Sequence, residues 1–163
     1  MTDARVGQVL VEGRFAGTAF LAGPHGIALT AAHVVSVAQS APYGPIRGNV
    51  RVQFGSQICD AAAEIPKPDL DIAVLRLAAE VGVDPLECGA APDCQTGLMY
   101  DFEATGYPHG SAVQQEGFVG KLVRRDEERN LLLSRGAHPG MSGGPIRIAG
   151  RVVGVQSRSG SAQ

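Results

Sequence analysis

The chain has 163 residues, of which 44% are hydrophobic, and 14 basic and 16 acidic residues give it a formal net charge of -2. This length supports one substantial core or two small barrels that share an interface. A net charge this close to zero does not predict a basic surface that would bind nucleic acid or an acidic membrane. No apolar stretch approaches the roughly 20 residues of a membrane helix, so we expect a soluble globular protein.

Cysteine usage and the N-terminus bear on the compartment. The three cysteines, Cys59, Cys88 and Cys94, are an odd number, and the opening MTDARVGQVL lacks a basic segment followed by a long apolar run. These features indicate a reduced, cytoplasmic setting, with secretion as the alternative if a signal peptide has been removed. Cys88 and Cys94 could pair or form half a metal site, but no second Cys/His pair completes zinc spacing. We expect no metal and no cofactor.

Glycine (22) and proline (10) divide the sequence into short runs rich in Val, Ile and Leu. Such runs are typical of an all-β sandwich or barrel. The segment TAAHVV interrupts the alternation and predicts a short helical turn. The predicted strands are 5–11, 16–22, 26–30, 48–54, 57–64, 70–77, 99–106, 112–124, 130–135, 144–149 and 151–157.

The composition changes between Leu77 and Leu98, where turn-forming and small residues replace the alternating pattern. This change predicts two β units within one domain, 1–80 and 98–163, joined by a connection over 81–97. The charge run RRDEER at 124–129 is interpreted as the solvated tip of a hairpin.

Residues 138–145 read HPGMSGGP and surround one hydroxyl with glycines. Glycine clusters mark tight turns or close backbone approaches, and such turns are common without any catalytic role. A nucleophilic serine would need a base, a group that orients the base, and N–H donors for the oxyanion. Gly140 and Ser142 could supply those N–H groups, while Gly143 and Gly144 would let a substrate approach.

Two upstream segments carry the other residue types that this chemistry requires. His33 lies at a strand-to-helix transition in GTAFLAGPHGIALTAAHVV (17–35), and Asp69 and Asp71 open the apolar strand KPDLDIAVLRL (67–77). Each of these residues also has a purely structural interpretation. His33 could be a core or turn histidine, and the aspartates could form a turn or an N-terminal cap at the start of the strand. A carboxylate beside a buried strand requires a cation or a hydrogen-bond donor, so at least one of the two should be paired.

The segments TAAHVV, DIAVLRL and GMSGGP follow one another along the chain and carry His, Asp and Ser in that order. With these segments the sequence resembles the chymotrypsin-like (trypsin-like) serine proteases, most nearly their compact bacterial members, from about Gly17 to Gly154. The resemblance implies an all-β fold of two antiparallel β-barrels with the active site in the cleft between them. It implies a triad of His33, Asp71 and Ser142, and favours Asp71 over Asp69. The implied function is a serine endopeptidase that hydrolyses protein or peptide substrates through an acyl-enzyme, with an oxyanion hole at Gly140 and Ser142.

The chain departs from the family pattern near the nucleophile. Met141 stands where zymogen-activated members carry an aspartate, so activation by a new N-terminal amine is not expected. Only 21 residues follow Ser142, which indicates either a reduced second barrel or a sequence that ends early. The chain also resembles the protease modules fused to other domains in bacterial cytosolic signalling proteins, so fused or associated regulatory domains are one expectation.

The resemblance also places the walls of the pocket for the side chain before the scissile bond. Gly136 stands where a trypsin-type aspartate would be, so cleavage after Lys or Arg is disfavoured. A small or aliphatic residue is the first expectation, and an acidic one the second if His138 or Arg158 points inward. The expected pocket residues are Gly136, Ala137, His138, Val155, Gln156, Ser157 and Arg158.

Two other functions remain open at this point. A protein-binding module could keep the protease fold without turnover, and an esterase or acyltransferase could use the same nucleophile. His25 and His109 lie in Gly/Pro turns, where structural roles are expected.

Overall fold

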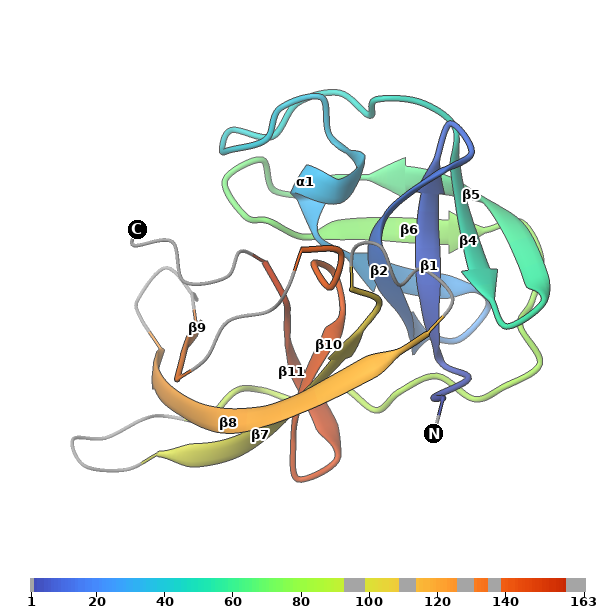
Figure 1. Ribbon diagram of the computed structural model, residues 1–163. Helices are drawn as coiled ribbons and strands as arrows, with labels where there is room; N and C mark the ends of the chain where they lie inside the picture. The colour runs from blue at the N-terminus through green and yellow to red at the C-terminus, as the bar shows by residue number, and fades with distance from the viewer. Residues whose placement is uncertain (1, 93–98, 109–113, 126–130, 135–138, 158–163) are drawn as a thin grey trace.

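The computed structural model describes residues 2–92, 99–108, 114–125, 131–134 and 139–157, which form β-strands and one short helix (Figure 1). The strands of the first half are β1 (Val6–Val11), β2 (Arg14–Gly23), β3 (Ile27–Thr30), β4 (Val50–Phe54), β5 (Gln57–Glu64) and β6 (Ala73–Leu77), and the helix is α1 (Ala32–Val35). The strands of the second half are β7 (Tyr100–Gly106), β8 (Glu116–Arg125), β9 (Leu131–Leu133), β10 (Pro145–Ile148) and β11 (Arg151–Val155).

The first half closes into a six-stranded antiparallel barrel in the order β1-β2-β3-β6-β5-β4. Period-2 alternation of buried and less buried residues sends every second side chain inward, as in β4, where Val50, Val52 and Phe54 are buried and the residues between them are not. Pairing of β1 with β4 closes the barrel, so neither strand presents an open edge. The barrel therefore forms a rigid frame for the loops that leave it.

The second half is a curled antiparallel sheet in the order β11-β10-β7-β8-β9. Phe102 and Phe118 meet edge to face inside it, with ring centroids 5.8 Å apart. A Cβ atom on Gly154 of β11 would lie 2.7 Å from a methyl carbon of Leu131 in β9, which shows how far the two outer strands curl toward each other. The predicted all-β fold of two antiparallel barrels is thus confirmed, with five strands in the described part of the second.

Every predicted strand is present, and α1 forms at TAAHVV as predicted, but two strands begin three or more residues later than expected. β6 begins at Ala73 rather than at residue 70, because a turn closed by the Leu70 N–H and the Lys67 carbonyl (3.0 Å) precedes it. β8 begins at Glu116 rather than at residue 112. The later start of β6 leaves Asp71 outside the ladder, where its carboxylate is free to meet another element.

The two halves share an apolar interface. Val6 and Phe20 of the first barrel pack with Leu86 of the connection and with Tyr107 and Val152 of the second half. In Figure 1, α1 and the turn that leads into β10 lie on facing sides of this interface. Within the described ranges, no helix has the length and hydropathy to cross a membrane.

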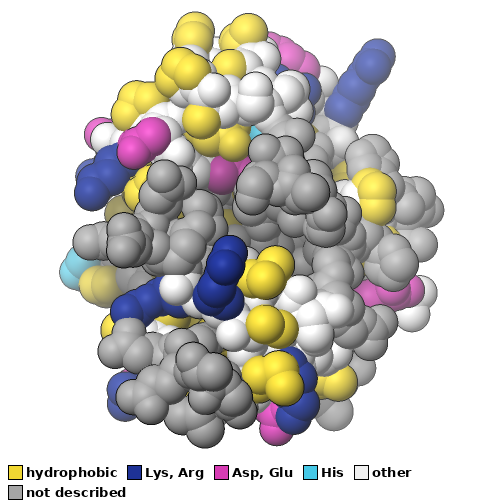
Figure 2. Space-filling model, turned by 90° about the vertical axis from the view of Figure 1, so that its left-hand side faces the viewer, with side chains coloured by type: hydrophobic (Ala, Val, Ile, Leu, Met, Phe, Trp, Pro, Cys, Tyr) yellow, Lys and Arg dark blue, Asp and Glu magenta, His cyan; other side chains and the backbone are white. Residues whose placement is uncertain are grey.

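The outer face of the second sheet is mixed in character. Val119 and Val123 of β8 and Leu132 of β9 are exposed, and Figure 2, which views the molecule from this side, shows hydrophobic side chains beside Lys and Arg side chains there. Exposed side chains of both kinds on one sheet face are ordinary for a protein surface.

Candidate active site

His33 and Asp71 come together although 38 residues separate them in sequence. Helix α1 carries His33, and the turn before β6 carries Asp71. The Asp71 carboxylate accepts from the His33 backbone N–H at 2.8 Å and from the ring Nδ1 at 2.7 Å. Asp69 is exposed, so the structure brings Asp71, and not Asp69, to the imidazole.

The surroundings of Asp71 keep it ionised. Burial by itself would raise the pKa of this carboxyl, but hydrogen bonds from His33 and Ser157 and the charge of the His33 ring outweigh that effect and lower it. An ionised carboxylate only accepts hydrogen bonds, so Nδ1 of His33 carries the proton. In the neutral ring, Nε2 then holds the lone pair.

Ser157 lies between Asp71 and Ser142. Its hydroxyl donates to the Asp71 carboxylate, and its backbone carbonyl accepts from the Ser142 hydroxyl at 2.7 Å. The resemblance placed Ser157 in the wall of the substrate pocket, so its contact with the carboxylate was missed. Ser157 thereby connects the second half of the chain to the carboxylate of the first.

Ser142 lies in the turn before β10. Its backbone carbonyl accepts from the N–H of Thr18 in β2 at 2.8 Å. A Cβ atom on Gly17 would lie 2.7 Å from a methyl carbon of Val34 and 2.9 Å from the Ser142 carbonyl oxygen, so Ser142 approaches the helix that carries His33. Within the described part of the chain, the Ser142 hydroxyl bonds Ser157 and not His33.

The glycines after Ser142 permit close packing of the chain against itself. Gly143 has a φ of +94°, and a Cβ atom there would lie 1.9 Å from the Thr18 carbonyl oxygen. A Cβ on Gly144 would lie 2.0 Å from the carbonyl oxygen of Thr105. Close packing against other parts of the protein therefore accounts for both glycines, and their role in letting a substrate approach stays a prediction.

The turn that carries Ser142 also contains the two backbone N–H groups expected to form the oxyanion hole, those of Gly140 and Ser142. Among the residues that the structure describes, neither the Gly140 nor the Ser142 N–H donates a hydrogen bond. Gly140 has a φ of +94°, a conformation that favours glycine. Met141, between them, is 1% exposed. This position therefore carries a buried apolar side chain and no carboxylate with which a new N-terminal amine could pair.

The sequence profile of the trypsin-like peptidase domain family matches residues 17–155, which include His33, Asp71 and Ser142. The chain belongs to this family. None of the curated proteins compared matches the chain in sequence.

Solved structures of proteases share the fold of this trypsin-like peptidase domain. The HtrA-type protease AlgW with a decapeptide (23% identity, TM-score 0.67) aligns with 87% of this chain and 42% of its own. AlgW with a tripeptide (22%, 0.70) aligns with 93% of this chain and 50% of its own. The Rv3671c protease in its inactive form (23%, 0.69) aligns with 94% of this chain and 77% of its own. The chain thus spans about half the length of the AlgW chains.

The predicted pocket of this trypsin-like peptidase domain is described only in part. Val155 is half-buried and packs against the core of the first barrel and against the apolar interface between the two halves. Gln156 is 3% exposed, and its side-chain amide donates to the Thr105 carbonyl at 2.9 Å. Ser157 contacts Asp71 as described above, and the other predicted pocket residues, Gly136, Ala137, His138 and Arg158, lie outside the described residues.

The remaining His and Cys candidates are described only in part. His25 occupies the predicted turn with a φ of +61°, while His109 and Cys94 fall outside the described ranges. Burial raises the pKa of the Cys88 thiol. Within the part of the chain that the structure describes, no three His, Cys, Asp or Glu side chains group as metal ligands would.

Proposed function

We propose that the protein is a serine endopeptidase with His33, Asp71 and Ser142 as its triad. One observation carries the proposal: Asp71 accepts from His33 Nδ1 at 2.7 Å and from Ser157, whose carbonyl receives the Ser142 hydroxyl at 2.7 Å. Base, orienting carboxylate and hydroxyl therefore meet within one short chain of contacts. The family assignment and the peptide-bound AlgW structures support a peptide or protein as the substrate.

In the first step, the Ser142 hydroxyl turns from the Ser157 carbonyl to Nε2 of His33. Ser142 Oγ attacks the scissile carbonyl carbon as His33 accepts the hydroxyl proton, and Asp71 stabilises the imidazolium that results. His33 then gives this proton to the departing amine, the C–N bond breaks, and an ester joins the acyl group to Ser142. Water attacks the ester by the same route and restores the free hydroxyl.

The negative charge that develops on the carbonyl oxygen requires donors. The N–H groups of Gly140 and Ser142 have no acceptor among the described residues, and both belong to the turn that carries the nucleophile. Backbone donors held in a turn cost no reorganisation as the charge forms, so a pair of this kind lowers the barrier substantially.

For the residue before the scissile bond, we propose a small or aliphatic side chain, with an acidic one as the alternative. Gly136 offers no carboxylate to a Lys or Arg side chain, which is the basis of this preference. Cleavage of a peptide library tests it, because preferred cleavage after Lys or Arg would contradict the assignment of Gly136.

Labelling with a fluorophosphonate tests the activity itself. The wild-type protein should form a covalent adduct on Ser142, whereas His33→Ala should react slower by several powers of ten, because the hydroxyl is a weak nucleophile without its base. The adduct is located by mass spectrometry of the digested protein. Equal labelling of the two proteins, or none of the folded wild type, would contradict the proposal.

A protein-binding module without turnover is a second candidate, favoured by one observation. The Ser142 hydroxyl donates to the Ser157 carbonyl and not to His33 in this structure. If that arrangement persists in solution, the folded protein will resist the fluorophosphonate. The same experiment therefore distinguishes the two functions.

A further inference from the structure

Thr18 of β2 lies across the interface between the two halves from the turn that carries Gly140 and Ser142. Its side chain is fully buried. The Thr18 backbone N–H donates to the Ser142 carbonyl at 2.8 Å, and its hydroxyl donates to the Gly140 carbonyl at 2.9 Å. One residue of the first barrel thus holds the carbonyls of both residues whose N–H groups would stabilise the oxyanion.

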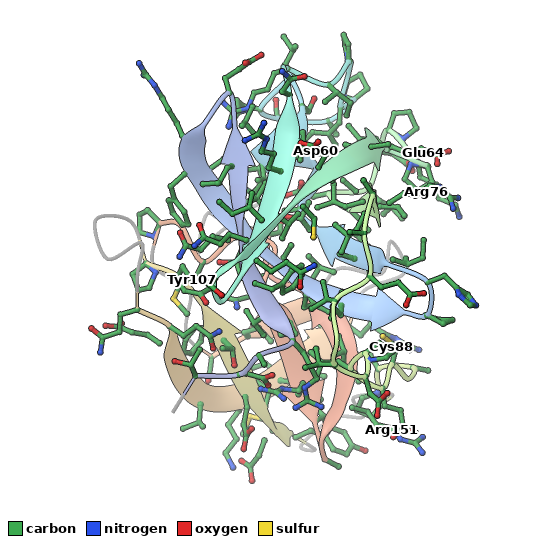
Figure 3. The ribbon with its side chains drawn as sticks, turned by 90° about the vertical axis from the view of Figure 1, so that its right-hand side faces the viewer. Asp60, Glu64, Arg76, Cys88, Tyr107 and Arg151 are labelled. Atoms are coloured by element: carbon green, nitrogen blue, oxygen red, sulfur yellow. The ribbon has the colours of Figure 1, made fainter. Side chains whose placement is uncertain are left out.

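The same hydroxyl also accepts a hydrogen bond. The backbone N–H of Tyr107, the residue after β7, donates to it at 3.0 Å. Figure 3 labels Tyr107, which lies where the second sheet meets the first barrel. Because a hydroxyl has one proton and two lone pairs, these contacts leave the Thr18 proton directed at Gly140.

Gly140 is the position in the turn that most needs such an anchor. Glycine adopts positive and negative φ almost equally well, so the Gly140 N–H could turn away without steric cost. The hydrogen bond to its carbonyl fixes the Gly140–Met141 peptide, which limits rotation about the Cα–C bond of Gly140 and holds its Cα atom in place for the preceding N–H. The turn would then keep its N–H groups aimed at one point before a substrate arrives, which is the condition for effective oxyanion stabilisation.

We propose that Thr18 is a positioning residue for the oxyanion hole, and that its hydroxyl, by fixing the Gly140 carbonyl, holds Gly140 in its catalytic position across the interface between the two halves. This inference rests on the proposed function, because it assigns the orientation of Gly140 to one side chain outside the triad. Thr18 touches no reacting atom and acts only through the turn.

The test compares Thr18→Val with Thr30→Val in saturation kinetics with a fluorophosphonate. Thr30 is a matched control, because it is fully buried in the adjacent strand β3 and its hydroxyl donates to one carbonyl, that of Thr18, at 2.7 Å. Loss of an entire oxyanion donor lowers rates about 10²- to 10³-fold. Misorientation of one donor in Thr18→Val should therefore lower the maximal labelling rate roughly 10- to 100-fold and leave the half-saturating concentration within about twofold.

Thr18→Ser keeps the hydroxyl and should restore the rate to within about threefold of the wild type. Thr30→Val should lose thermal stability as Thr18→Val does but label at close to the wild-type rate. If Thr18→Val does not fold, Thr18→Ala removes the hydroxyl without placing a methyl group against the Tyr107 N–H and carries the same comparison.

Equal rates in Thr18→Val and Thr30→Val, or a Thr18→Ser protein as slow as Thr18→Val, would overturn the positioning role while leaving the proposed function intact. Failure of the proposed function has a different signature, because the folded wild type itself would then not react. In that case the positioning role falls with it.

Discussion

At the scale of single residues, Asp71 and Asp69 provide a sharp test of the triad, because they lie two residues apart and differ in their contacts. Asp71→Asn should lower the rate of fluorophosphonate labelling about 10⁴-fold, since an amide facing Nδ1 can favour the wrong ring tautomer. Asp69→Asn should leave the rate unchanged, because Asp69 is exposed. Similar rates in the two variants would exclude Asp71 as the orienting group.

The residues that could be predicted from the sequence are those with a local motif. His33, Asp71 and Ser142 each lie in a short recognisable segment, so their types and order were visible before their contacts. The observed contacts of Thr18 and Ser157 were not predicted. Their hydroxyls reach partners 122 and 86 residues away, Gly140 and Asp71, and no local pattern specifies such pairs.

At the scale of elements, the turn from Ser142 into β10 requires glycine at position 143 for two reasons, a left-handed backbone conformation and the lack of room for a side chain. Gly143→Ala should destabilise the fold by at least about 4 kcal/mol, because its Cβ would lie 1.9 Å from the Thr18 carbonyl oxygen and its φ is +94°. Urea unfolding measures the loss. Covalent labelling of Ser142 should be lost as well.

Gly150, in the hairpin between β10 and β11, separates the two causes. It has a φ of +81°, but a Cβ atom there would meet nothing within 4 Å. Gly150→Ala should therefore cost only about 1 to 2 kcal/mol for the left-handed conformation and leave labelling unchanged. Equal costs at the two glycines would show that backbone conformation, and not close packing, explains the requirement at position 143.

The strands themselves were predictable because alternation and turn residues are local signals, whereas their exact starts were not. β6 begins three residues after its predicted start, since the Leu70 N–H bonds the Lys67 carbonyl and Asp71 bonds α1. Alternation continues through residues whose hydrogen bonds go elsewhere, so a sequence pattern alone extends the strand too far.

At the scale of the whole molecule, the segment before β1 fastens the first barrel to the second half. The Asp3 carboxylate accepts from Arg5 at 3.0 Å and from Arg147 of β10 at 3.2 Å. Gln115 accepts from the Asp3 N–H at 2.9 Å and donates to the Asp3 carbonyl at 2.7 Å. The Asp3 and Arg147 side chains are only 17% and 16% exposed, so water screens this pair weakly.

These contacts predict a pH-dependent contribution to stability. Burial by itself would raise the pKa of Asp3, but the hydrogen bonds from Arg5 and the charges of Arg5 and Arg147 lower it below the ordinary 3.8. A carboxyl with a lower pKa in the folded state stabilises the fold at pH values above 3.8, and this contribution is lost as the pH falls through the folded-state pKa.

Asp3→Asn should therefore lower stability by about 1 to 2 kcal/mol near pH 7, since it removes charge-assisted hydrogen bonds, and Tm by roughly 3 to 6 °C. The difference from the wild type should shrink as thermal unfolding is repeated at decreasing pH below about 4. Asp60→Asn is the control: Asp60, labelled in Figure 3, pairs with Arg51 at 3.0 Å, but both side chains are mostly exposed, so its loss should cost under about 0.5 kcal/mol. A loss in Asp3→Asn that stays constant down to pH 3, or that is no larger than in Asp60→Asn, would mean that the ionised Asp3 carboxylate does not help hold the two halves together.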